Sequence, residues 1–327
     1  MDRRIIILGN GLEWCEKSLS DFKNVPNTKI INKLFPYKSK ILRKFLNVHF
    51  SDKLNKKKSL PFKSMWFPYF VKCMSTDRDT PLLIIIYDRN KLANEAKFLS
   101  YLRKYYKDVK LVYLFTNIAQ ISGASRYGFL DKLNTYYDVV YAFDPQDVPR
   151  YNYKYFPLLY SKNELKNVVP KEEVFYVGAA KDRYKMLISV YERLRELGIS
   201  SKYYIAGVQE EKAYSEDIVY NQFISYSQCL RHIQESRCLV DVIQGESEGY
   251  TIKVCEAVIY DKLLITTNEK VKEAPFYNPE YMLVIEKPED IKKEFFDPSK
   301  VVKYSEEGKD YFSVKRFLKQ VETDLNE

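Results

Sequence analysis

Short apolar runs alternate with helical stretches along the whole chain, and this alternation constrains the fold more than any other feature. In the first half, the apolar runs are residues 4–8, 81–88, 109–115 and 138–144. Stretches with helical periodicity lie between them, at residues 12–22, 90–106 and 126–137. Strands that alternate with helices in this way are typical of parallel α/β units.

The second half of the chain repeats the pattern. Its apolar runs are residues 172–178, 201–207, 237–243, 262–267 and 281–286. Helical stretches cover residues 182–198, where a glycine ends the pattern, and residues 226–236. The chain therefore reads as two similar α/β halves.

The polar, proline-containing segment 155–173 indicates a linker between these halves. We predict an N-terminal Rossmann-like domain over residues 1–158 and a C-terminal one over residues 159–308. Residues 309–327 form a predicted C-terminal helix that packs back toward the N-terminal domain. The predicted fold class is α/β, with two Rossmann-like domains facing a cleft at the carboxyl ends of their strands.

Charge and composition limit the partners. The net charge is +9, which favours phosphate-bearing partners such as nucleotides, anionic lipids or nucleic acid. The chain has five cysteines, none in a C-x-x-C pair, so we expect free thiols in a reducing compartment. His49 and His232 stand in no metal-ligand pattern, and we expect no metal ion. His232 reads as a packed or surface histidine.

The location follows from the apolar segments. The run after the N-terminal residues MDRR is shorter than the apolar region of a signal peptide. Residues 81–87 are also too short to span a bilayer. We therefore expect a cytoplasmic protein.

The segment GESEGYTIKVCEA, residues 245–257, carries the strongest chemical signal. It joins the apolar run 237–243 to a helix predicted to begin near Thr251. The N-terminus of such a helix offers free N–H groups and the positive end of the helix dipole to an anion. Glu256, between one and two turns into this helix, can reach a ribose hydroxyl beside the anion. The alternative is that Glu248 and Glu256 are two solvated surface charges.

This segment resembles the E-x7-E signature of retaining glycosyltransferases of the GT-B fold, especially glycosyltransferase family 4. The matching residues are Glu248, Gly249, Tyr250, Glu256 and Ala257. Thr251 and Lys253 depart from the signature, because the family usually has Gly and Pro there. The resemblance extends over residues 172–285, whereas the N-terminal half resembles the family only in its general fold.

The resemblance implies a role for each matching position. Glu248 would hold hydroxyls of a donor sugar, and Glu256 would hold the ribose hydroxyls of its nucleotide. Gly249, Tyr250 and Thr251 would offer backbone N–H groups to the diphosphate. The resemblance also implies retention of the anomeric configuration, in which the leaving phosphate takes the acceptor proton. A nucleotide-diphosphate sugar is then a co-substrate, with no cofactor and no metal.

Cations follow the first strand of the second half. Enzymes of the resembled family place a basic pair there to hold the donor phosphates, and Lys181 and Arg183 are the candidates, with Lys185 as a third. A leaving diphosphate requires such cations. The alternative is that they are ordinary charges at a helix start, although two cations there are unfavourable without a nearby anion.

Two more loops are candidates for nucleotide contacts. Ile224 and Ser225 lie in a segment that resembles the loop framing the base, and the alternative for Ser225 is a plain helix N-cap. Gly9, Asn10 and Gly11 end the first strand and could lie near the diphosphate or the acceptor. Their alternative is a tight structural turn, since a full G-x-G-x-x-G motif is lacking.

The N-terminal half supplies candidate acceptor contacts. Asp88–Arg89, Thr116–Asn117 and Ser122–Gly123 follow apolar runs, at the strand ends that face the ligand in parallel sheets. The sequence does not rank them.

Residues 33–70 combine many cations with interleaved aromatic residues, and Asp52 is the one acid between residues 33 and 63. This combination suits an anionic membrane surface. A solvated basic face beside an acceptor groove explains it equally well. Nucleic acid is a less suitable partner, because no nucleic-acid-binding signature accompanies the stretch.

Together, these observations predict a hexosyltransferase-type glycosyltransferase. It would move a sugar from a nucleotide-diphosphate donor to a glycan or polyprenol-linked acceptor, in the synthesis of a bacterial surface polysaccharide such as capsule or lipopolysaccharide. It would act in the cytoplasm, peripherally at the inner face of the membrane. The alternatives are a GT-B-like sugar-nucleotide epimerase, an inverting transferase, or a non-catalytic homologue that binds glycans or partner proteins.

Overall fold

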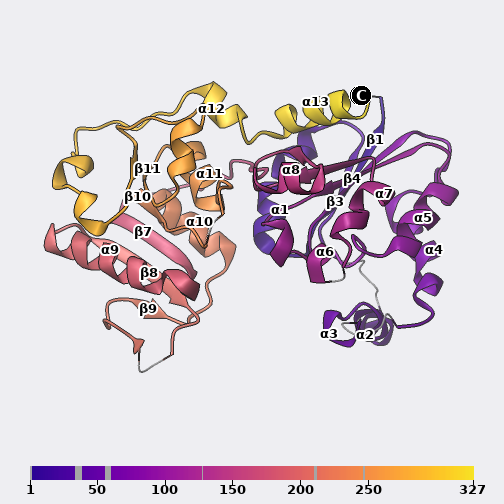
Figure 1. Ribbon diagram of the computed structural model, residues 1–327, viewed down its shortest axis with the longest axis horizontal. Helices are drawn as coiled ribbons and strands as arrows, with labels where there is room; N and C mark the ends of the chain where they lie inside the picture. The colour runs from indigo at the N-terminus through magenta and orange to yellow at the C-terminus, as the bar shows by residue number, and fades with distance from the viewer. Residues whose placement is uncertain (1, 34–38, 56–59, 127, 210–211, 246) are drawn as a thin grey trace. The chain divides into compact units, whose positions relative to one another are not determined.

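The computed structural model describes residues 2–327 except 34–38, 56–59, 127, 210–211 and 246 (Figure 1). The chain forms two compact units. The first unit consists of Met1–Pro157 together with Phe317–Glu327, and the second consists of Leu158–Arg316. Within the described residues, each unit contains its own six-stranded parallel sheet, so the predicted α/β class with two Rossmann-like halves is confirmed.

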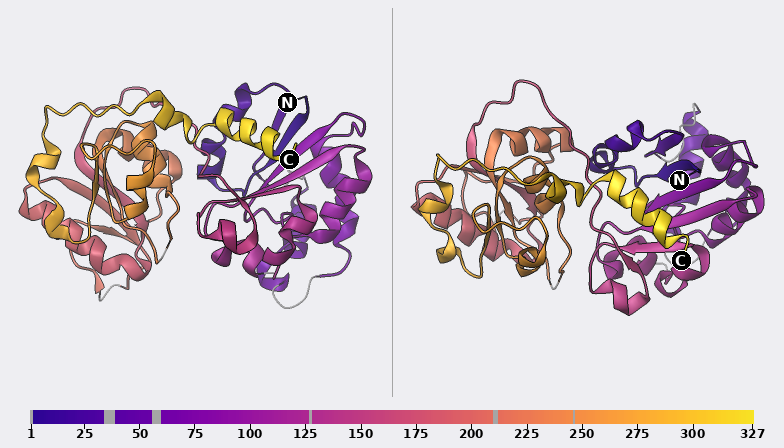
Figure 2. Two further views of the ribbon diagram at one scale, coloured as in Figure 1. Left: turned by 45° about the horizontal axis from the view of Figure 1, so that its top comes forward. Right: turned by 90° about the horizontal axis from the view of Figure 1, so that it is seen from above.

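The sheet of the first unit has the strand order β2-β1-β3-β4-β5-β6. Its strands are β1 (Arg4–Leu8), β2 (Thr28–Ile31), β3 (Leu82–Tyr87), β4 (Val109–Leu114), β5 (Val139–Ala142) and β6 (Lys154–Tyr155). Every residue of β3 is buried. Helices on both faces of the sheet produce this burial, which explains why the run is apolar throughout rather than alternating (Figure 2).

Several short helices complete the first unit. They are α1 (Glu13–Ser18), α2 (Lys40–His49), α3 (Asp52–Asn55), α4 (Phe67–Met74), α5 (Ala96–Tyr105), α6 (Gly123–Arg126), α7 (Leu133–Tyr136) and α8 (Asp147–Tyr151). The helix predicted over 90–106 begins only at Ala96. The reason is a turn held by Asn90, whose side-chain oxygen accepts the N–H of Leu92 at 3.0 Å.

The C-terminal helix α13 (Val314–Asp324) contributes its last part to the first unit. Phe317 is fully buried and packs edge-on against Tyr141 and Phe156. The amide of Gln320 donates to the carbonyl oxygen of Tyr155 at 3.0 Å. These contacts attach the end of the chain to the β5–β6 side of the first sheet.

The sheet of the second unit has the order β12-β11-β10-β7-β8-β9, which is the doubly wound Rossmann arrangement. Its strands are β7 (Glu172–Ala179), β8 (Ser201–Ala206), β9 (Val219–Tyr220), β10 (Ser236–Asp241), β11 (Leu263–Thr266) and β12 (Met282–Val284). Its helices are α9 (Tyr184–Glu196), α10 (Tyr226–Glu235), α11 (Ile252–Ile259) and α12 (Glu306–Asp310). Right-handed crossovers place α9 on one face and α10 and α11 on the other (Figure 1).

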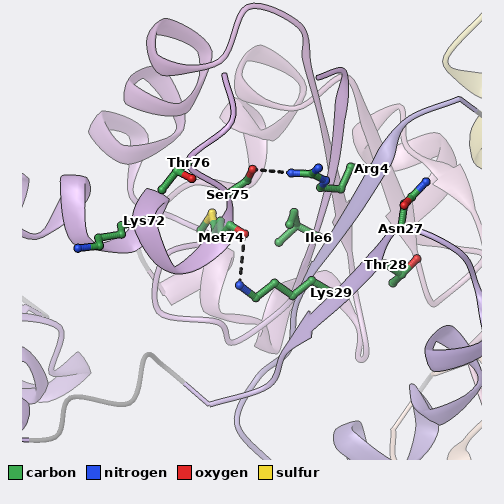
Figure 3. A pocket seen from close by; sticks show the side chains of 9 residues that line it. All are labelled: Arg4, Ile6, Asn27, Thr28, Lys29, Lys72, Met74, Ser75 and Thr76. Atoms are coloured by element: carbon green, nitrogen blue, oxygen red, sulfur yellow. Dashed lines mark hydrogen bonds between the residues drawn. The ribbon is translucent and has the colours of Figure 1, made fainter. Parts of the chain in front are cut away.

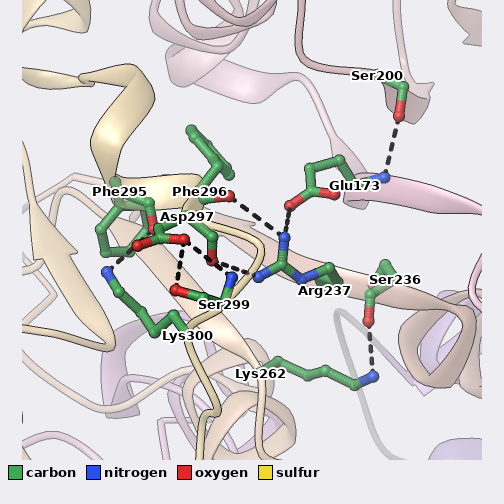
Figure 4. A network of polar contacts seen from close by, with 10 residues as sticks. All are labelled: Glu173, Ser200, Ser236, Arg237, Lys262, Phe295, Phe296, Asp297, Ser299 and Lys300. Carbon is green, nitrogen blue, oxygen red and sulfur yellow. Dashed lines mark hydrogen bonds and ion pairs between the residues drawn. The ribbon is translucent and has the colours of Figure 1, made fainter.

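Polar contacts secure the amino edge of the second sheet (Figure 4). The guanidinium of Arg237 pairs with Glu173 at 2.6 Å and donates to the carbonyl of Asp297 at 2.9 Å. The ammonium of Lys262 donates to the carbonyls of Gln234 and Ser236, where α10 ends and β10 begins. Charged side chains at this edge therefore serve the fold, and the opposite, carboxyl edge is where a ligand is expected.

Candidate functional site

Ligands of doubly wound sheets bind beyond the carboxyl ends of the strands, where the strand order reverses. In the second unit this switch point lies between β7 and β10. The segment after β7 carries Lys181 and Arg183, and the segment after β10 carries Glu248. The fold therefore brings these three sequence-predicted residues to one edge of one sheet.

Hydrogen bonds join the segments that follow β7 and β10. The ammonium of Lys181 donates to the side-chain oxygen of Gln244. The carboxylate of the next residue, Asp182, accepts the N–H of Gly245 at 3.1 Å. Lys181 has a φ of 45°, a left-handed conformation that non-glycine residues seldom adopt and that is common at functional sites.

Arg183 ties the strand ends together in a different way. Its Nε donates to the carbonyl of Ala179 at 3.1 Å, and a terminal nitrogen donates to the carbonyl of Val242 at 2.7 Å. The side chain is half-buried. A Cβ atom at Gly178 would lie 2.6 Å from the hydroxyl of Tyr176, so the glycine leaves room for that ring beside the guanidinium. Arg183 therefore fixes the edge, while Lys181 is the more exposed cation.

Thr251 fixes the start of α11. Its hydroxyl accepts the N–H of Lys253 at 3.2 Å as an N-cap and donates to the carboxylate of Asp241 at 2.8 Å. The other oxygen of Asp241, which is 1% exposed, accepts from the hydroxyl of Thr266 at 3.1 Å. Glycine, the usual residue of the resembled family at position 251, could make neither side-chain bond. The departure from the family pattern thus anchors α11 to the end of β10.

Asn268, which follows β11, holds the backbone of the motif. Its amide nitrogen donates to the carbonyl of Gly249 at 3.2 Å and lies 3.5 Å from that of Glu248. Tyr250 is buried, and its ring packs edge-on against Phe276. The Tyr250 side chain is thus part of the core, and its expected contribution to a ligand is its backbone N–H.

Glu256, the second glutamate of the motif, lies on α11 and is 3% exposed. One carboxylate oxygen accepts a 2.7 Å hydrogen bond from the hydroxyl of Tyr226, at the start of α10. The Tyr226 hydroxyl lies 2.8 Å from that of Tyr160. The surface-pair alternative fails for Glu256, because a solvated charge would not be buried and bonded.

Charges of both signs meet beneath the motif. Burial raises the pKa of Glu256 to about 7, although Lys253 and the Tyr226 hydroxyl act in the opposite direction. Burial also raises the pKa of Asp241. It lowers the pKa of Lys253, while Asp241 and Glu256 act to raise it. The ammonium of Lys253, 5.3 Å from the centre of the Tyr176 ring, thus lies in the same region as two buried carboxylates, and groups with shifted pKa values cluster in this way at functional sites.

Ile224 and Ser225 precede α10, in the segment that follows β9. Ser225 is the N-cap: its hydroxyl accepts the N–H of Gln228 at 3.2 Å, and its own N–H donates to the Gln228 side chain at 2.8 Å. The predicted N-cap role of Ser225 is therefore confirmed. The next residue, Tyr226, connects this segment to Glu256.

Gly9, Asn10 and Gly11 lie at the switch point of the first sheet, between β1 and β3. A Cβ at Gly9 would lie 2.3 Å from the side-chain oxygen of Asn32. That same oxygen accepts the N–H of Gly11 at 3.2 Å, and the amide of Asn90 donates to the carbonyl of Gly9 at 2.5 Å. The segment is a closely packed turn, as its structural alternative predicted.

Buried polar groups lie near this turn. Asp88, directly after β3, is fully buried, and one of its oxygens accepts the N–H of Gly123 at 3.2 Å and faces the hydroxyl of Tyr113 at 3.4 Å. Its other oxygen is buried without a partner among the described residues, as is the side-chain oxygen of Asn94. Burial raises the pKa of Asp88. Among the loops predicted to meet an acceptor, the loop that contains Asp88 therefore has a carboxylate oxygen that could accept a hydrogen bond from a ligand.

A cavity of about 400 Å³ opens near the amino ends of β1 and β2 in the first sheet (Figure 3). It is lined by Arg4 of β1 and Lys29 of β2. The Lys29 ammonium donates to the carbonyl of Cys73 at 2.6 Å, and Arg4 donates to the hydroxyl of Ser75 at 2.9 Å. Lys29 thus caps the C-terminal end of α4, and Arg4 holds the side chain of Ser75, which follows the helix, so a structural role explains both cations.

Glu172, His232 and Glu235 place ligand-type atoms within 4.8 Å of one another. They lie where β7 begins and α10 ends, away from the carboxyl edge. The buried Glu235 already pairs with Lys171 at 3.1 Å and with Arg231 at 3.6 Å. The His232 ring stacks on Phe175, at 5.0 Å between centroids. Cations supply the countercharge here, and the packed histidine fits the interpretation from the sequence.

Sequence reasoning missed four residues of the carboxyl edge: Asp241, Tyr226, Asn268 and Lys253. In the sequence, Asp241 is an acid inside the apolar run 237–243, and Lys253 is a departure from the family pattern. A carboxylate that ends a buried strand is unusual, and that signal could have identified Asp241.

Comparison with known proteins places the fold. No family model and no curated protein sequence matches the chain. Among solved structures, HepE of Anabaena, in complex with UDP and glucose, matches with a TM-score of 0.56 and 10% identity, covering 98% of this chain and 99% of that one. AviGT4, a glycosyltransferase of avilamycin A biosynthesis, matches with a TM-score of 0.53 and 8% identity, covering 98% of each chain.

A third match is α,α-trehalose 6-phosphate synthase of Burkholderia multivorans, with a TM-score of 0.53 and 9% identity over 100% of this chain and 97% of that one. At such low identities these matches establish the fold alone. The two parallel sheets and these structural neighbours together show that the chain has the GT-B fold.

Proposed function

We propose that this protein is a glycosyltransferase that uses a nucleotide-diphosphate sugar. The observation that carries the proposal is the carboxyl edge of the second sheet, where the segments after β7 and β10 are hydrogen bonded through Lys181, Asp182 and Arg183. Beside them, α11 begins at a capped N-terminus. A strained cation and a helix N-terminus at a switch point form a suitable diphosphate site.

Each part of a donor has a corresponding group at this edge. The diphosphate binds Lys181, Arg183 and the backbone N–H groups of residues 249–251. Glu256 accepts ribose hydroxyls with the carboxylate that Tyr226 orients. Glu248 holds hydroxyls of the sugar, and Ile224 and Ser225 face the base. The complex of HepE with UDP and glucose makes UDP-glucose the first donor to test.

Transfer follows from the leaving-group chemistry. The bond between the anomeric carbon and the diphosphate oxygen breaks, and the nucleoside diphosphate leaves with the electron pair. Lys181 and Arg183 stabilise the charge that develops on it. The acceptor oxygen bonds to the anomeric carbon on the face that the diphosphate leaves, and its proton passes to the leaving phosphate. The anomeric configuration is retained, and no protein base is needed.

The acceptor is a glycan or a polyprenol-linked sugar, and the transferred group is a hexose. The first unit binds it through loops such as the one that contains Asp88, where a buried carboxylate oxygen has no partner in the part of the chain that the structure describes. The setting is the synthesis of a surface polysaccharide such as capsule or lipopolysaccharide, at the inner face of the membrane.

The test is a thermal-shift screen of nucleoside diphosphates and nucleotide sugars, followed by NMR of the products. We expect one nucleotide base to stabilise the protein and the corresponding sugar nucleotide to be consumed with retention. An inverted product would show an inverting transferase, and an epimerised donor without transfer would show an epimerase. If the protein bound and consumed no nucleotide sugar, the result would favour the alternative of a non-catalytic homologue.

A further inference from the structure

Helix α2 presents an apolar face to the surroundings of the first unit. Ile41, Phe45 and Val48 follow one another at intervals of four and three residues, which places them on one face of the helix. Their exposed fractions are 79%, 55% and 47%. Leu46, at 1% exposure, is the residue of α2 that packs into the unit. The helix therefore has two apolar sides, and the wider one lacks cover from the described residues.

Exposed apolar residues continue on the neighbouring segments. The indole N–H of Trp66, in the turn η2 (Lys63–Trp66), donates to Nδ1 of His49 at 2.7 Å, which holds η2 against the end of α2. Phe62, before η2, is 77% exposed and has a φ of 62°. A bulky residue in this left-handed conformation is rare, and here it leaves a phenyl ring in the solvent. Further exposed apolar side chains are Leu42, Leu54 and Met65.

Cations flank this face. Lys40, Arg43 and Lys44 are exposed, and α2 contains no acidic residue. A helix with apolar residues on one side and unopposed cations beside them is the pattern of helices that lie in the plane of an anionic bilayer. In that position the apolar side chains enter the acyl boundary while the cations meet lipid phosphates.

We propose that α2 and η2 dock the protein on an anionic lipid surface, through Ile41, Phe45, Val48 and Phe62 as apolar anchors and Lys40, Arg43 and Lys44 as phosphate contacts. The charge distribution favours this occupant over others. A second copy paired face to face would bring the same cations together without an acid on α2 to oppose them. Nucleic acid would meet the cations but would leave the aliphatic side chains in water.

This docking is peripheral. None of the helices that the structure describes is long and apolar enough to cross a bilayer. The proposal does not depend on the donor site, which lies in the other unit. Docking would place the enzyme on the same lipid surface as a polyprenol-linked acceptor.

The test is vesicle flotation of the full chain. We expect partition onto vesicles that contain about 30 mol% phosphatidylglycerol in phosphatidylcholine, weaker partition at high salt, and little onto phosphatidylcholine alone. Phe45→Glu and Ile41→Glu should each reduce the bound fraction about tenfold or more. Val301→Glu is the control, because Val301 of the second unit is as exposed as Ile41; it should leave partition unchanged. Circular dichroism checks that each variant is folded.

Two results would overturn the proposal. One is equal partition of wild type and Phe45→Glu. The other is no partition at low salt together with a concentration-dependent dimer that Phe45→Glu abolishes, which would assign the face to a second copy. Nucleotide affinity measured on the same variants should match wild type, so loss of membrane binding and loss of donor binding are separable outcomes.

Discussion

The hydroxyl of Tyr226 donates a 2.7 Å hydrogen bond to the carboxylate of Glu256, and this bond joins the start of α10 to α11. It links two segments that were predicted separately to touch the nucleotide. The bond orients the carboxylate and favours its ionised form. Both effects bear on ribose binding, because an ionised carboxylate accepts hydrogen bonds from ribose hydroxyls and a protonated one does so less well.

Tyr226→Phe should therefore weaken nucleotide binding. The variant removes the donor, so the pKa of Glu256 should move above about 7. We expect about a fivefold to thirtyfold loss of affinity near pH 7, equivalent to about 1–2 kcal/mol. Titrations from pH 6 to 9 should show the wild-type affinity rising through about pH 7 and the variant following at higher pH.

Tyr304→Phe is the matched control. This tyrosine is also buried, and its hydroxyl donates to the carbonyl of Lys262 at 3.1 Å, away from the motif. It should keep the wild-type affinity and pH profile. If Tyr226→Phe also kept both, the assignment of Glu256 to the ribose would lose its support.

Glu256→Gln should stabilise the unliganded protein at high pH. The pKa of Glu256 is about 7 when folded, above its ordinary 4.5, so the protonated form favours folding. This contribution is present below about pH 4.5 and is lost as the pH rises through 7. At pH 8 the free energy of unfolding of Glu256→Gln should exceed that of the wild type by about 1–3 kcal/mol.

Urea denaturation at pH 5 and pH 8 measures this difference, which should be small at pH 5. The same variant should bind nucleotide less tightly, so stability and affinity move in opposite directions. A variant that is less stable than wild type at pH 8 would contradict the interpretation of the buried charges.

Thr251→Ala should destabilise the second unit by about 1–2 kcal/mol, because it removes both the N-cap of α11 and the bond to Asp241. Thr251→Ser retains the hydroxyl and should lose less than half as much. Chemical denaturation compares the two. Equal losses would show that the methyl group matters rather than the hydrogen bonds.

Lys181 and Arg183 should respond differently to substitution. Lys181→Gln should leave stability unchanged. It should weaken the binding of a nucleoside diphosphate about tenfold and leave the binding of the nucleoside itself unaffected. Arg183→Gln should also destabilise the fold, because it removes bonds to the carbonyls of Ala179 and Val242. Lys293→Gln, an exposed cation of the second unit away from the motif, serves as the control. Equal loss for nucleoside and diphosphate would contradict a phosphate role for Lys181.

The sequence predicted the central strands of both sheets, because strands buried on both faces are short uninterrupted apolar runs, as β3 and β11 are. It missed β2, β6 and β9, which lie at sheet edges and have only two to four residues. It also predicted that the motif lies between a strand and a helix. Helix starts were predicted less well. Helix α5 begins six residues after its predicted start, because the side chain of Asn90 holds a local turn. Such competition between a side chain and the helix is not visible in periodicity.

The support of the site was not predictable in the same way. Tyr226 and Glu256 are 30 residues apart, and their contact depends on α10 and α11 covering the same face of the sheet. Asn268 reaches the motif from the end of β11 for a similar reason. The basic, aromatic stretch was recognised from composition, but only the three-dimensional structure separates Leu46, inside the unit, from Ile41 and Phe45 outside it.

Isothermal titration of nucleoside diphosphates into the wild type, Glu256→Ala and Lys181→Gln tests whether the second unit holds a donor site. We expect saturable one-to-one binding of at least one nucleoside diphosphate to the wild type, with UDP as the first to try. Both variants should weaken this binding about tenfold. Binding of none of the nucleotides, or equal affinity in all three proteins, would contradict a donor site at the carboxyl edge of the second sheet.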